Sequence, residues 1–203
     1  MEKIIEKITD KVINELFIKV EASGRHVHLS QEHLELLFGK NYKLTKTKDL
    51  SQPGQYACEE RVTLIGPKGK IENVVILGPV RKNTQVEVSK TDLRPLGLNA
   101  PIRESGDIKG SGSIKIKTEK TELEIKEGLI IAKRHIHMTP EDAKKHGVKD
   151  KEIVNVKIFS NRPLIFEDVV IRVSDNYKTF MHIDYDEANA CGFKKDTLAI
   201  IKK

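Results

Sequence analysis

The first stretch of the chain has the hydrophobic pattern of an amphipathic helix. In residues 1–17 the apolar side chains fall within a sector of about 120° at 100° per residue, and Lys, Glu and Asp occupy most of the opposite side. The apolar stripe consists of Met1, Ile4, Ile5, Ile8, Val12 and Leu16. About four turns of helix are marginally stable alone in water, so we expect the stripe to pack on another surface.

Downstream, apolar and polar residues alternate in short segments, as in half-buried β-strands. The segments with this pattern are 18–20, 62–65, 71–77, 114–117, 123–125 and much of 152–201, with one helical stretch near 186–190. Gly66-Pro67-Lys68-Gly69 lies between two of them and predicts a β-hairpin. Residues 41–60 and 91–113 are rich in turn-forming residues and are expected to be loops. Short strands at regular spacing favour β-barrels.

A motif with two histidines occurs twice, 109 residues apart. The copies are Arg25-His26-Val27-His28-Leu29-Ser30-Gln31-Glu32 and Arg134-His135-Ile136-His137-Met138-Thr139-Pro140-Glu141. Side chains two positions apart in a strand point to the same side, so each pair would present two imidazoles to one point. Two converging imidazoles are half of a tetrahedral zinc site.

Each motif also ends like the start of a helix. Ser30 and Thr139 can cap a helix, and Pro140 suits its first position. Each copy therefore predicts a strand, a cap and a short helix. The alternative is a pair of surface histidines beside a helix cap, and the repetition of the whole motif argues against it.

A second internal similarity supplies a third ligand for each pair. Residues 72–77 resemble residues 167–172 at an offset of 95, and the same register places Glu87 opposite His182 and Arg81 opposite Asn176. We therefore expect one zinc site from His26, His28 and Glu87 and another from His135, His137 and His182. Taken singly, Glu87 is better explained as an exposed carboxylate on a strand, and His182 as a half-buried histidine on a strand. Their matched register favours the interpretation that both are metal ligands.

Composition excludes several classes of protein. The chain has 203 residues, 38% of them hydrophobic, which suffices for one ordinary domain or two small ones. The net charge is +6, but aromatic residues make up only 5% and are not interleaved with basic blocks, which disfavours nucleic-acid binding. Two cysteines indicate a reducing cytoplasm. Neither a transmembrane span nor a signal peptide is expected.

The chain resembles the PduL-type phosphotransacylases, also called phosphate propanoyltransferases, of bacterial microcompartments and some fermentative bacteria. The matching motifs span nearly the whole chain and lie at residues 24–30, 52–57, 62–69, 77–81, 85–89, 134–138, 181–184 and 186–190. The resemblance implies an enzyme that interconverts acyl-CoA plus phosphate with acyl phosphate plus CoA, and propanediol degradation is a pathway typical of such enzymes. It also implies two zinc ions in the sites above and a phosphate contact from Arg81.

The resemblance further implies a mainly β fold of two small β-barrel domains capped by short helices, preceded by the amphipathic N-terminal helix. The N-terminal strand would pair into the barrel of the C-terminal half. The expected domains are therefore residues 18–24 plus 133–203 and residues 25–132. Residues 1–17 would either pack on the protein or its partner in a homodimer or higher oligomer, or act as an encapsulation peptide for a microcompartment shell.

Three further residues are weaker candidates for substrate contacts. Arg25 and Arg134 would suit CoA phosphates, although surface charge explains them equally well. Ser105 lies in a loop with Gly110-Ser111-Gly112, whose backbone N–H groups could hold a phosphate, although a flexible turn is the simpler interpretation.

The sequence favours direct attack by phosphate on the thioester, because no serine nucleophile elbow or Ser-His-Asp order is present. The alternatives are a zinc hydrolase with metal-bound water as nucleophile and a structural zinc protein of a shell. The sequence leaves the choice between acetyl and propanoyl open, since one methylene is worth only about 1–3 kcal/mol in a pocket.

Overall fold

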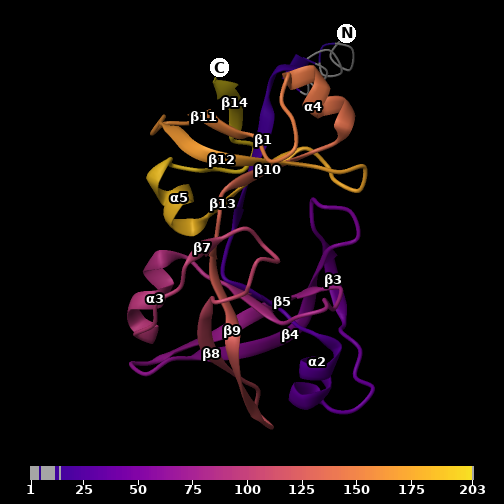
Figure 1. The fold of residues 1–203 in the computed structure, drawn as a ribbon, viewed down its shortest axis with the longest axis vertical. Coiled ribbons are helices and arrows are strands. Elements are labelled where there is room, and N and C mark those ends of the chain that lie inside the picture. The colour runs from indigo at the N-terminus through magenta and orange to yellow at the C-terminus, as the bar shows by residue number, and fades with distance from the viewer. Residues whose placement is uncertain (1–4, 6–11, 14, 203) are drawn as a thin grey trace. The chain divides into compact units, whose positions relative to one another are not determined.

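A computed structural model describes residues 5, 12, 13 and 15–202 of the chain. The chain divides into two compact units, Met1–Ser23 with Arg134–Lys203 and Gly24–Lys133. Both are mainly β, and short helices lie beside the sheets in each (Figure 1). Whether each unit folds as an independent domain stays a prediction.

The first unit is a closed barrel of six strands in the order β1-β13-β10-β12-β11-β14. Its strands are β1 (Ile18–Ser23), β10 (His135–Met138), β11 (Ile153–Phe159), β12 (Ile165–Val173), β13 (Phe180–Asp184) and β14 (Leu198–Lys202). Its helices are α4 (Pro140–His146) and α5 (Tyr185–Ala190). The indigo strand β1 therefore lies in a sheet whose other strands are orange and yellow in Figure 1. This confirms that the first strand pairs into the C-terminal barrel.

The second unit contains the remaining strands. These are β2 (His26–His28), β3 (Lys46–Asp49), β4 (Tyr56–Ile65), β5 (Lys70–Gly78), β6 (Gln85–Glu87), β7 (Ile102–Arg103), β8 (Gly112–Lys117) and β9 (Glu122–Ala132). Because β8 pairs with both β4 and β9, a six-stranded ring closes in the order β9-β6-β2-β5-β4-β8. Helices α2 (Gln31–Phe38) and α3 (Lys90–Leu96) belong to this unit. Two β-barrels, as expected, make up the fold.

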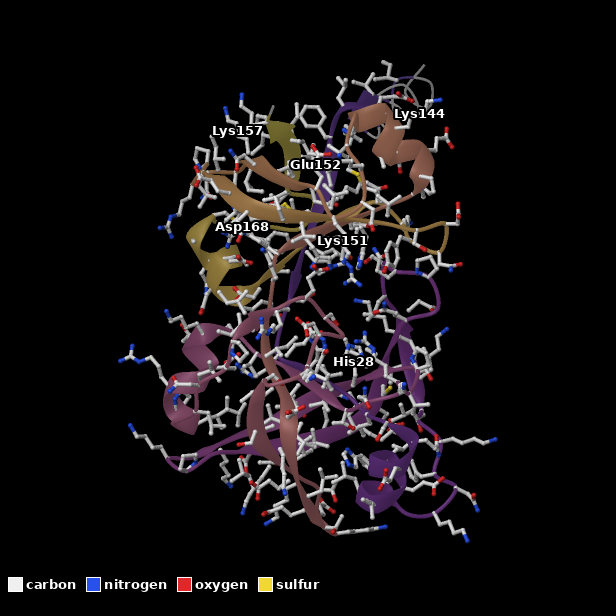
Figure 2. The ribbon with its side chains drawn as sticks, in the orientation of Figure 1. His28, Lys144, Lys151, Glu152, Lys157 and Asp168 are labelled. Atoms are coloured by element: carbon white, nitrogen blue, oxygen red, sulfur yellow. The ribbon has the colours of Figure 1, made fainter. Side chains whose placement is uncertain are left out.

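The two barrels share the same pattern of strand pairing. Strand β2 pairs parallel with β5 and antiparallel with β6, and β10 pairs in the same way with β12 and β13. Asn73 in β5 and Asp168 in β12, which is labelled in Figure 2, both have a positive φ, of 59° and 56°. Asn and Asp tolerate this left-handed conformation better than most residues. The offset of 95 residues therefore marks a real structural repeat.

Each barrel encloses its own hydrophobic core. In β4 the alternating residues Cys58, Val62 and Leu64 are buried, as the pleat of a strand requires. In the other barrel Ile136 and Ile171 are fully buried. Burying one such aliphatic side chain contributes about 1.5–3 kcal/mol. The histidine motifs run along strands that these cores hold in place.

Several local predictions are confirmed. Strands β4 and β5 form the expected hairpin. Ser30 Oγ accepts a hydrogen bond from the His33 backbone N–H at 3.2 Å, and Thr139 Oγ1 accepts one from Asp142 at 3.1 Å. Both caps are followed by short helices, as their sequences predicted.

Two expected loops were wrong in part. Residues 41–60 contain β3 and the first half of β4. Strand β3 was missed because this edge strand is polar and exposed throughout and so has no hydrophobic alternation. Residues 91–113 contain most of α3. This helix was missed because Pro95 lies inside it, and proline usually interrupts a helix.

The amphipathic helix expected at residues 1–17 lies largely outside the described residues. Of its stripe, Ile5, Val12 and Leu16 are described; all three are helical and exposed. Glu15 forms an ion pair with Lys145 of α4 at 2.9 Å, and Phe17 meets Phe159 edge to face, with 5.6 Å between ring centroids. Within the described part of the chain, no helix has the length and apolar character needed to cross a membrane.

Candidate metal centres

Strands β2 and β6 bring His26, His28 and Glu87 to one point. His26 lies directly opposite Glu87 in the antiparallel pair. One ligand-forming atom from each of the three residues lies within 4.8 Å of the other two. His26 Nε2 is 3.5 Å from a Glu87 carboxylate oxygen, and all three residues are at least nine-tenths buried. The predicted set of residues therefore forms a compact cluster.

Backbone carbonyls orient the two imidazoles of this cluster. His26 Nδ1 is 2.8 Å from the Gly24 carbonyl oxygen, and His28 Nδ1 is 3.2 Å from that of Leu77. A carbonyl oxygen only accepts, so each Nδ1 carries the hydrogen and donates it. Nε2 of each ring is then the nitrogen with a free lone pair, as in histidines that bind a metal.

Burial and charge favour the metal-binding protonation states of His28 and Glu87. Burial lowers the pKa of His28 well below its ordinary value, and the nearby charges of His26 and Arg81 lower it further. Burial raises the pKa of Glu87, but the charge of His26 and its hydrogen bond reverse this, so that pKa lies well below its usual range. For His26, burial lowers the pKa, but the neighbouring Glu87 carboxylate raises it, and the net effect is a rise. A cation bound here would take the place of the His26 proton beside Glu87.

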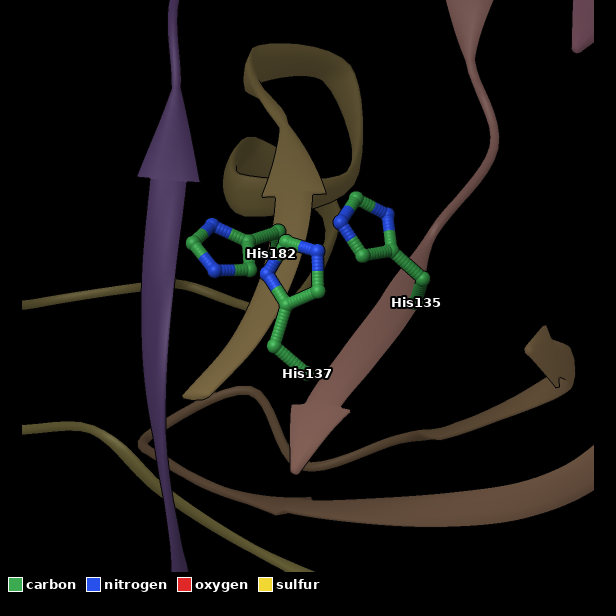
Figure 3. A group of neighbouring side chains, drawn as sticks. All are labelled: His135, His137 and His182. Atoms are coloured by element: carbon green, nitrogen blue, oxygen red, sulfur yellow. The ribbon is translucent and has the colours of Figure 1, made fainter. Parts of the chain in front are cut away.

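The second cluster is made of three histidines (Figure 3). His135 and His137 come from β10, and His182 comes from β13 directly opposite His135. Ring centroids are 4.6 Å apart for His135 and His137, 5.1 Å for His135 and His182, and 4.9 Å for His137 and His182. Ligand-forming atoms of all three again lie within 4.8 Å of one another.

The chemistry of this second cluster fits a bound cation. Among the described residues, buried Nδ1 of His137 has no hydrogen-bond partner, which is costly unless a ligand occupies it. Burial, together with the charges of His135, His182 and Arg172, lowers the pKa of His137 to about 2. His182 Nδ1 is 3.8 Å from a Glu21 carboxylate oxygen, close enough for a charge interaction but too far for a hydrogen bond. Three imidazoles held together in this way are a metal-binding set.

Both donor sets match those of catalytic zinc. Three histidines, or two histidines and a glutamate, leave a fourth position of a tetrahedral ion for water or substrate. The two groups that the structure describes contain three members each. The residues present therefore fit zinc, whereas the identity of the metal and the number of ions stay predictions.

Arg81 is joined to the first cluster through Ser105. Arg81 Nη1 donates to Ser105 Oγ at 3.0 Å, and the Ser105 hydroxyl donates to a Glu87 carboxylate oxygen at 2.8 Å. Gln85 Nε2 donates to the same Glu87 oxygen at 2.5 Å and to Ser105 at 2.9 Å. The Gly106 backbone N–H donates to Gln85 Oε1 at 2.7 Å, which completes the network. The carboxylate is therefore held in one orientation.

The loop that carries Arg81 is anchored beside the histidine motif. Arg81 backbone N–H donates to the Leu29 carbonyl at 2.8 Å, and the Ser30 N–H donates to Thr84 Oγ1 at 2.9 Å. His33 Nδ1 also lies 2.8 Å from Thr84 Oγ1. These bonds hold the guanidinium of Arg81 near the imidazoles whose pKa values it lowers.

Arg25 and Arg134 contact carboxylates of their own units. Arg25 Nη1 lies 2.5 Å from Asp92 Oδ1, and Arg134 Nη1 lies 2.7 Å from Glu187 Oε1. Burial raises the pKa of Glu187 despite the opposing effect of Arg134. Contact of either arginine with CoA stays a prediction.

Sequence reasoning missed Gln85, Arg172 and Tyr177. Gln85 precedes Glu87 by two positions, so the strand period alone places both on one side. Arg172 lies opposite His137 in the parallel pair of β10 and β12, and the Tyr177 ring centroid is 4.1 Å from that of His137. Position 172 matches Leu77 in the other half, so the repeat gave no signal there.

The two cysteines are unsuited to nucleophilic chemistry. Cys58 and Cys191 are free and fully buried, in the two separate cores. Burial raises the pKa of the Cys58 thiol to about 11 and also raises that of Cys191. Both thiols are therefore protonated at neutral pH, and the thiolate is the reactive form.

Comparison with known proteins identifies the family of this chain. The family model described as phosphate propanoyltransferase matches residues 19–194. The chain is 64% identical to the phosphate propanoyltransferase of Clostridioides difficile over 204 residues, covering 100% of this chain and 98% of that protein. It is 59% identical to the one of Listeria monocytogenes, covering 98% and 94%, and 55% identical to the one of Thermotoga maritima, covering 91% and 88%. The chain therefore belongs to the phosphate propanoyltransferase family.

Proposed function

We propose that this enzyme interconverts a short-chain acyl-CoA, propanoyl-CoA or acetyl-CoA, plus phosphate with the acyl phosphate plus CoA. The observation that supports this most is the connection of Arg81 through Ser105 to Glu87. It places a guanidinium, which binds phosphate oxygens in pairs, beside a cluster of metal-ligand type. The family relationship supplies the reaction class.

In the proposed reaction a phosphate oxygen attacks the thioester carbonyl carbon directly. The carbon–sulfur bond breaks, the acyl group is carried away on phosphate, and the CoA sulfur leaves as thiolate and takes up the proton that the attacking hydrogen phosphate loses. Zinc, one ion at each cluster, would supply Lewis acidity toward the carbonyl oxygen and a soft site for the sulfur. Arg81 orients the phosphate by two hydrogen bonds and balances its charge. The buried, protonated cysteines are consistent with a route that has no acyl-enzyme.

A zinc hydrolase would use the same donor sets, with water as the nucleophile. The guanidinium of Arg81 beside the cluster favours an anionic co-substrate, which a hydrolase does not need. The two functions differ in one measurable property, the requirement for phosphate.

The surroundings of the enzyme are also part of the proposal. We place it in the cytoplasm, as a homodimer or higher homo-oligomer, with residues 1–17 available to shell proteins of a bacterial microcompartment. Propanediol degradation is a pathway in which its product would be used. Neither nucleic acid nor membrane is proposed as a partner.

A thiol-release assay tests the reaction. Acetyl-, propanoyl- and butanoyl-CoA are each incubated with the enzyme, with and without phosphate, and free thiol is followed with time. We expect release only when phosphate is present, with kcat/KM differing between acetyl and propanoyl by about 10–200-fold at most. Equal release without phosphate would support the hydrolase instead.

A further inference from the structure

The arginine that precedes each histidine pair contacts an equivalent carboxylate in each barrel. Arg25 pairs with Asp92, and Arg134 pairs with Glu187. The arginines are related by the offset of 109 residues between the motifs, and the acids by the offset of 95 between the third ligands. Two separate parts of the repeat therefore meet in the same way in both units.

Each carboxylate also belongs to a helix cap. Asp92 is the third residue of α3 and accepts from the Ser89 backbone N–H through Oδ2, while its Oδ1 accepts from the arginine. Glu187 is the third residue of α5 and accepts from the Asp184 backbone N–H through Oε2, while its Oε1 accepts from the arginine. The carboxylate thus uses one oxygen for the cap and the other for the guanidinium.

The cap residue is two positions beyond the third ligand in both units. Ser89 follows Glu87 by two residues, and Asp184 follows His182 by two residues. An arginine next to the first histidine is therefore connected, through one carboxylate and one backbone N–H, to the strand that carries the third ligand. This connection runs beside the direct pairing of the two ligand strands.

Arg134 makes further contacts that restrain it. Its Nε donates to the Glu167 carbonyl oxygen at 2.7 Å, and its guanidinium lies 5.5 Å from the centroid of the Phe166 ring. The side chains of Arg134 and Glu187 are 30% and 16% exposed. A guanidinium that is partly shielded from water and donates two hydrogen bonds holds its carboxylate partner more firmly than one in an exposed ion pair does. Strand β10 is thereby tied to both β12 and α5.

We propose that Arg25 and Arg134 are positioning residues, each of which holds the three ligands of its own unit's metal cluster in the geometry that binds the ion. The inference rests on the proposed function in that the clusters must hold metal. A site works when its ligands stay within about 0.5 Å of the productive geometry, and loss of an outer contact typically weakens metal binding about 10–100-fold. A contact with CoA instead would change the KM for acyl-CoA and leave the affinity for zinc unaltered.

The test measures zinc affinity at one cluster at a time in the full-length protein. In a His28→Ala background the first cluster is disabled, and competition with a chromophoric chelator reports on the three histidines. Arg134→Ala should weaken zinc binding there about 10–100-fold. Arg162→Ala is the matched control, because Arg162 donates to the Asn189 carbonyl of the same helix α5 and belongs to neither cluster. Its affinity should equal that of the background.

The equivalent test exchanges the two units. In a His137→Ala background, Arg25→Ala should weaken zinc binding by His26, His28 and Glu87 by a similar factor. In the background with only the three histidines, Arg25→Ala should change nothing. Because the cap that each arginine contacts lies in its own unit, weaker zinc binding at the other unit's cluster would contradict the proposal.

Glu187→Gln provides a second variant, to be used if circular dichroism shows that Arg134→Ala does not fold. Gln can still accept the cap hydrogen bond, but it lacks the charge that binds Arg134, so zinc should again bind more weakly. Arg134→Ala and Glu187→Gln remove the same contact, so the double variant should bind zinc about as weakly as Arg134→Ala alone. Zinc affinities within twofold of the background in both single variants would overturn the positioning role. Wild-type protein that binds no zinc would instead overturn the proposed metal sites.

Discussion

His135 lies directly opposite His182 across the antiparallel strands β10 and β13. His26 and Glu87 occupy the same two positions in the other barrel. In both, the second histidine of the motif lies two residues further along the same strand, so three ligands converge without any long loop. Strand pairing, which the hydrophobic cores stabilise, therefore sets the geometry of each cluster. The predictions below test the clusters and the residues around them.

We predict that the purified enzyme holds about two zinc ions per chain, one at each three-residue cluster. His135→Ala should lower the zinc content by one ion, because two remaining imidazoles are a poor site. His146→Ala is a suitable control, since His146 is the last residue of α4 and is absent from both clusters. Elemental analysis gives the content directly, and active enzyme that contains no metal would rule out the idea.

Arg81→Lys should raise the KM for phosphate about ten- to hundredfold with the zinc content unchanged. Lysine keeps the charge but loses the planar pair of donors, and a hydrogen bond to a charged group is worth about 1.5–3 kcal/mol. Steady-state kinetics at varied phosphate measure the effect. Lys82→Ala is the matched control, because it removes an exposed cation at the next position. Ordinary phosphate kinetics in Arg81→Lys would show that Arg81 has no role in binding.

Ser105→Ala should weaken zinc binding at the first cluster about 10–100-fold. The hydroxyl donates to Glu87 and accepts from Arg81 and Gln85, so its loss removes one of the two hydrogen bonds that hold this carboxylate oxygen and leaves that of Gln85. The three-histidine cluster, measured separately in the His28→Ala background, is the control, because it contains none of these residues. Chelator competition in the His137→Ala background provides the measurement. An unchanged affinity there would limit Ser105 to a contact with substrate.

Removal of residues 1–16 should leave the zinc content and most of the activity intact. The truncation keeps Phe17 against Phe159 and loses the ion pair of Glu15 with Lys145, which at the surface is worth about 0–1 kcal/mol. The oligomer size measured by light scattering should change and co-fractionation with shell proteins should be lost, because the truncated protein lacks the exposed stripe residues Val12 and Leu16. Insoluble or inactive truncated protein would instead indicate that the helix packs on its own barrel.

The repeat made the two three-residue clusters predictable from sequence, whereas the barrels were expected from the short strands and the family resemblance. His26 and His28 could be placed on one side of a strand by its period, and Glu87 and His182 by the register of two similar segments. Helix α3 was not foreseen, although Ser89 and Asp92 have the spacing of a capping box, because Pro95 obscures its short pattern.

The contacts that only the fold creates could not be predicted. Arg134 is 53 residues from Glu187, and no local pattern links a strand to a helix cap that far away. Arg172 was not predicted for a different reason, since the matching residue in the other half is the apolar Leu77. The contacts of Arg134 and Arg172 could therefore not be predicted from periodicity or from the repeat.

The most direct test of the account is the stoichiometry of the products. Propanoyl-CoA and phosphate are incubated with the enzyme, and free thiol and propanoyl phosphate are measured in the same samples, the latter by phosphorus NMR. We predict one propanoyl phosphate for each thiol released, in both the early and the late part of the reaction. Thiol released together with free propanoate and no acyl phosphate would contradict the account and identify a hydrolase.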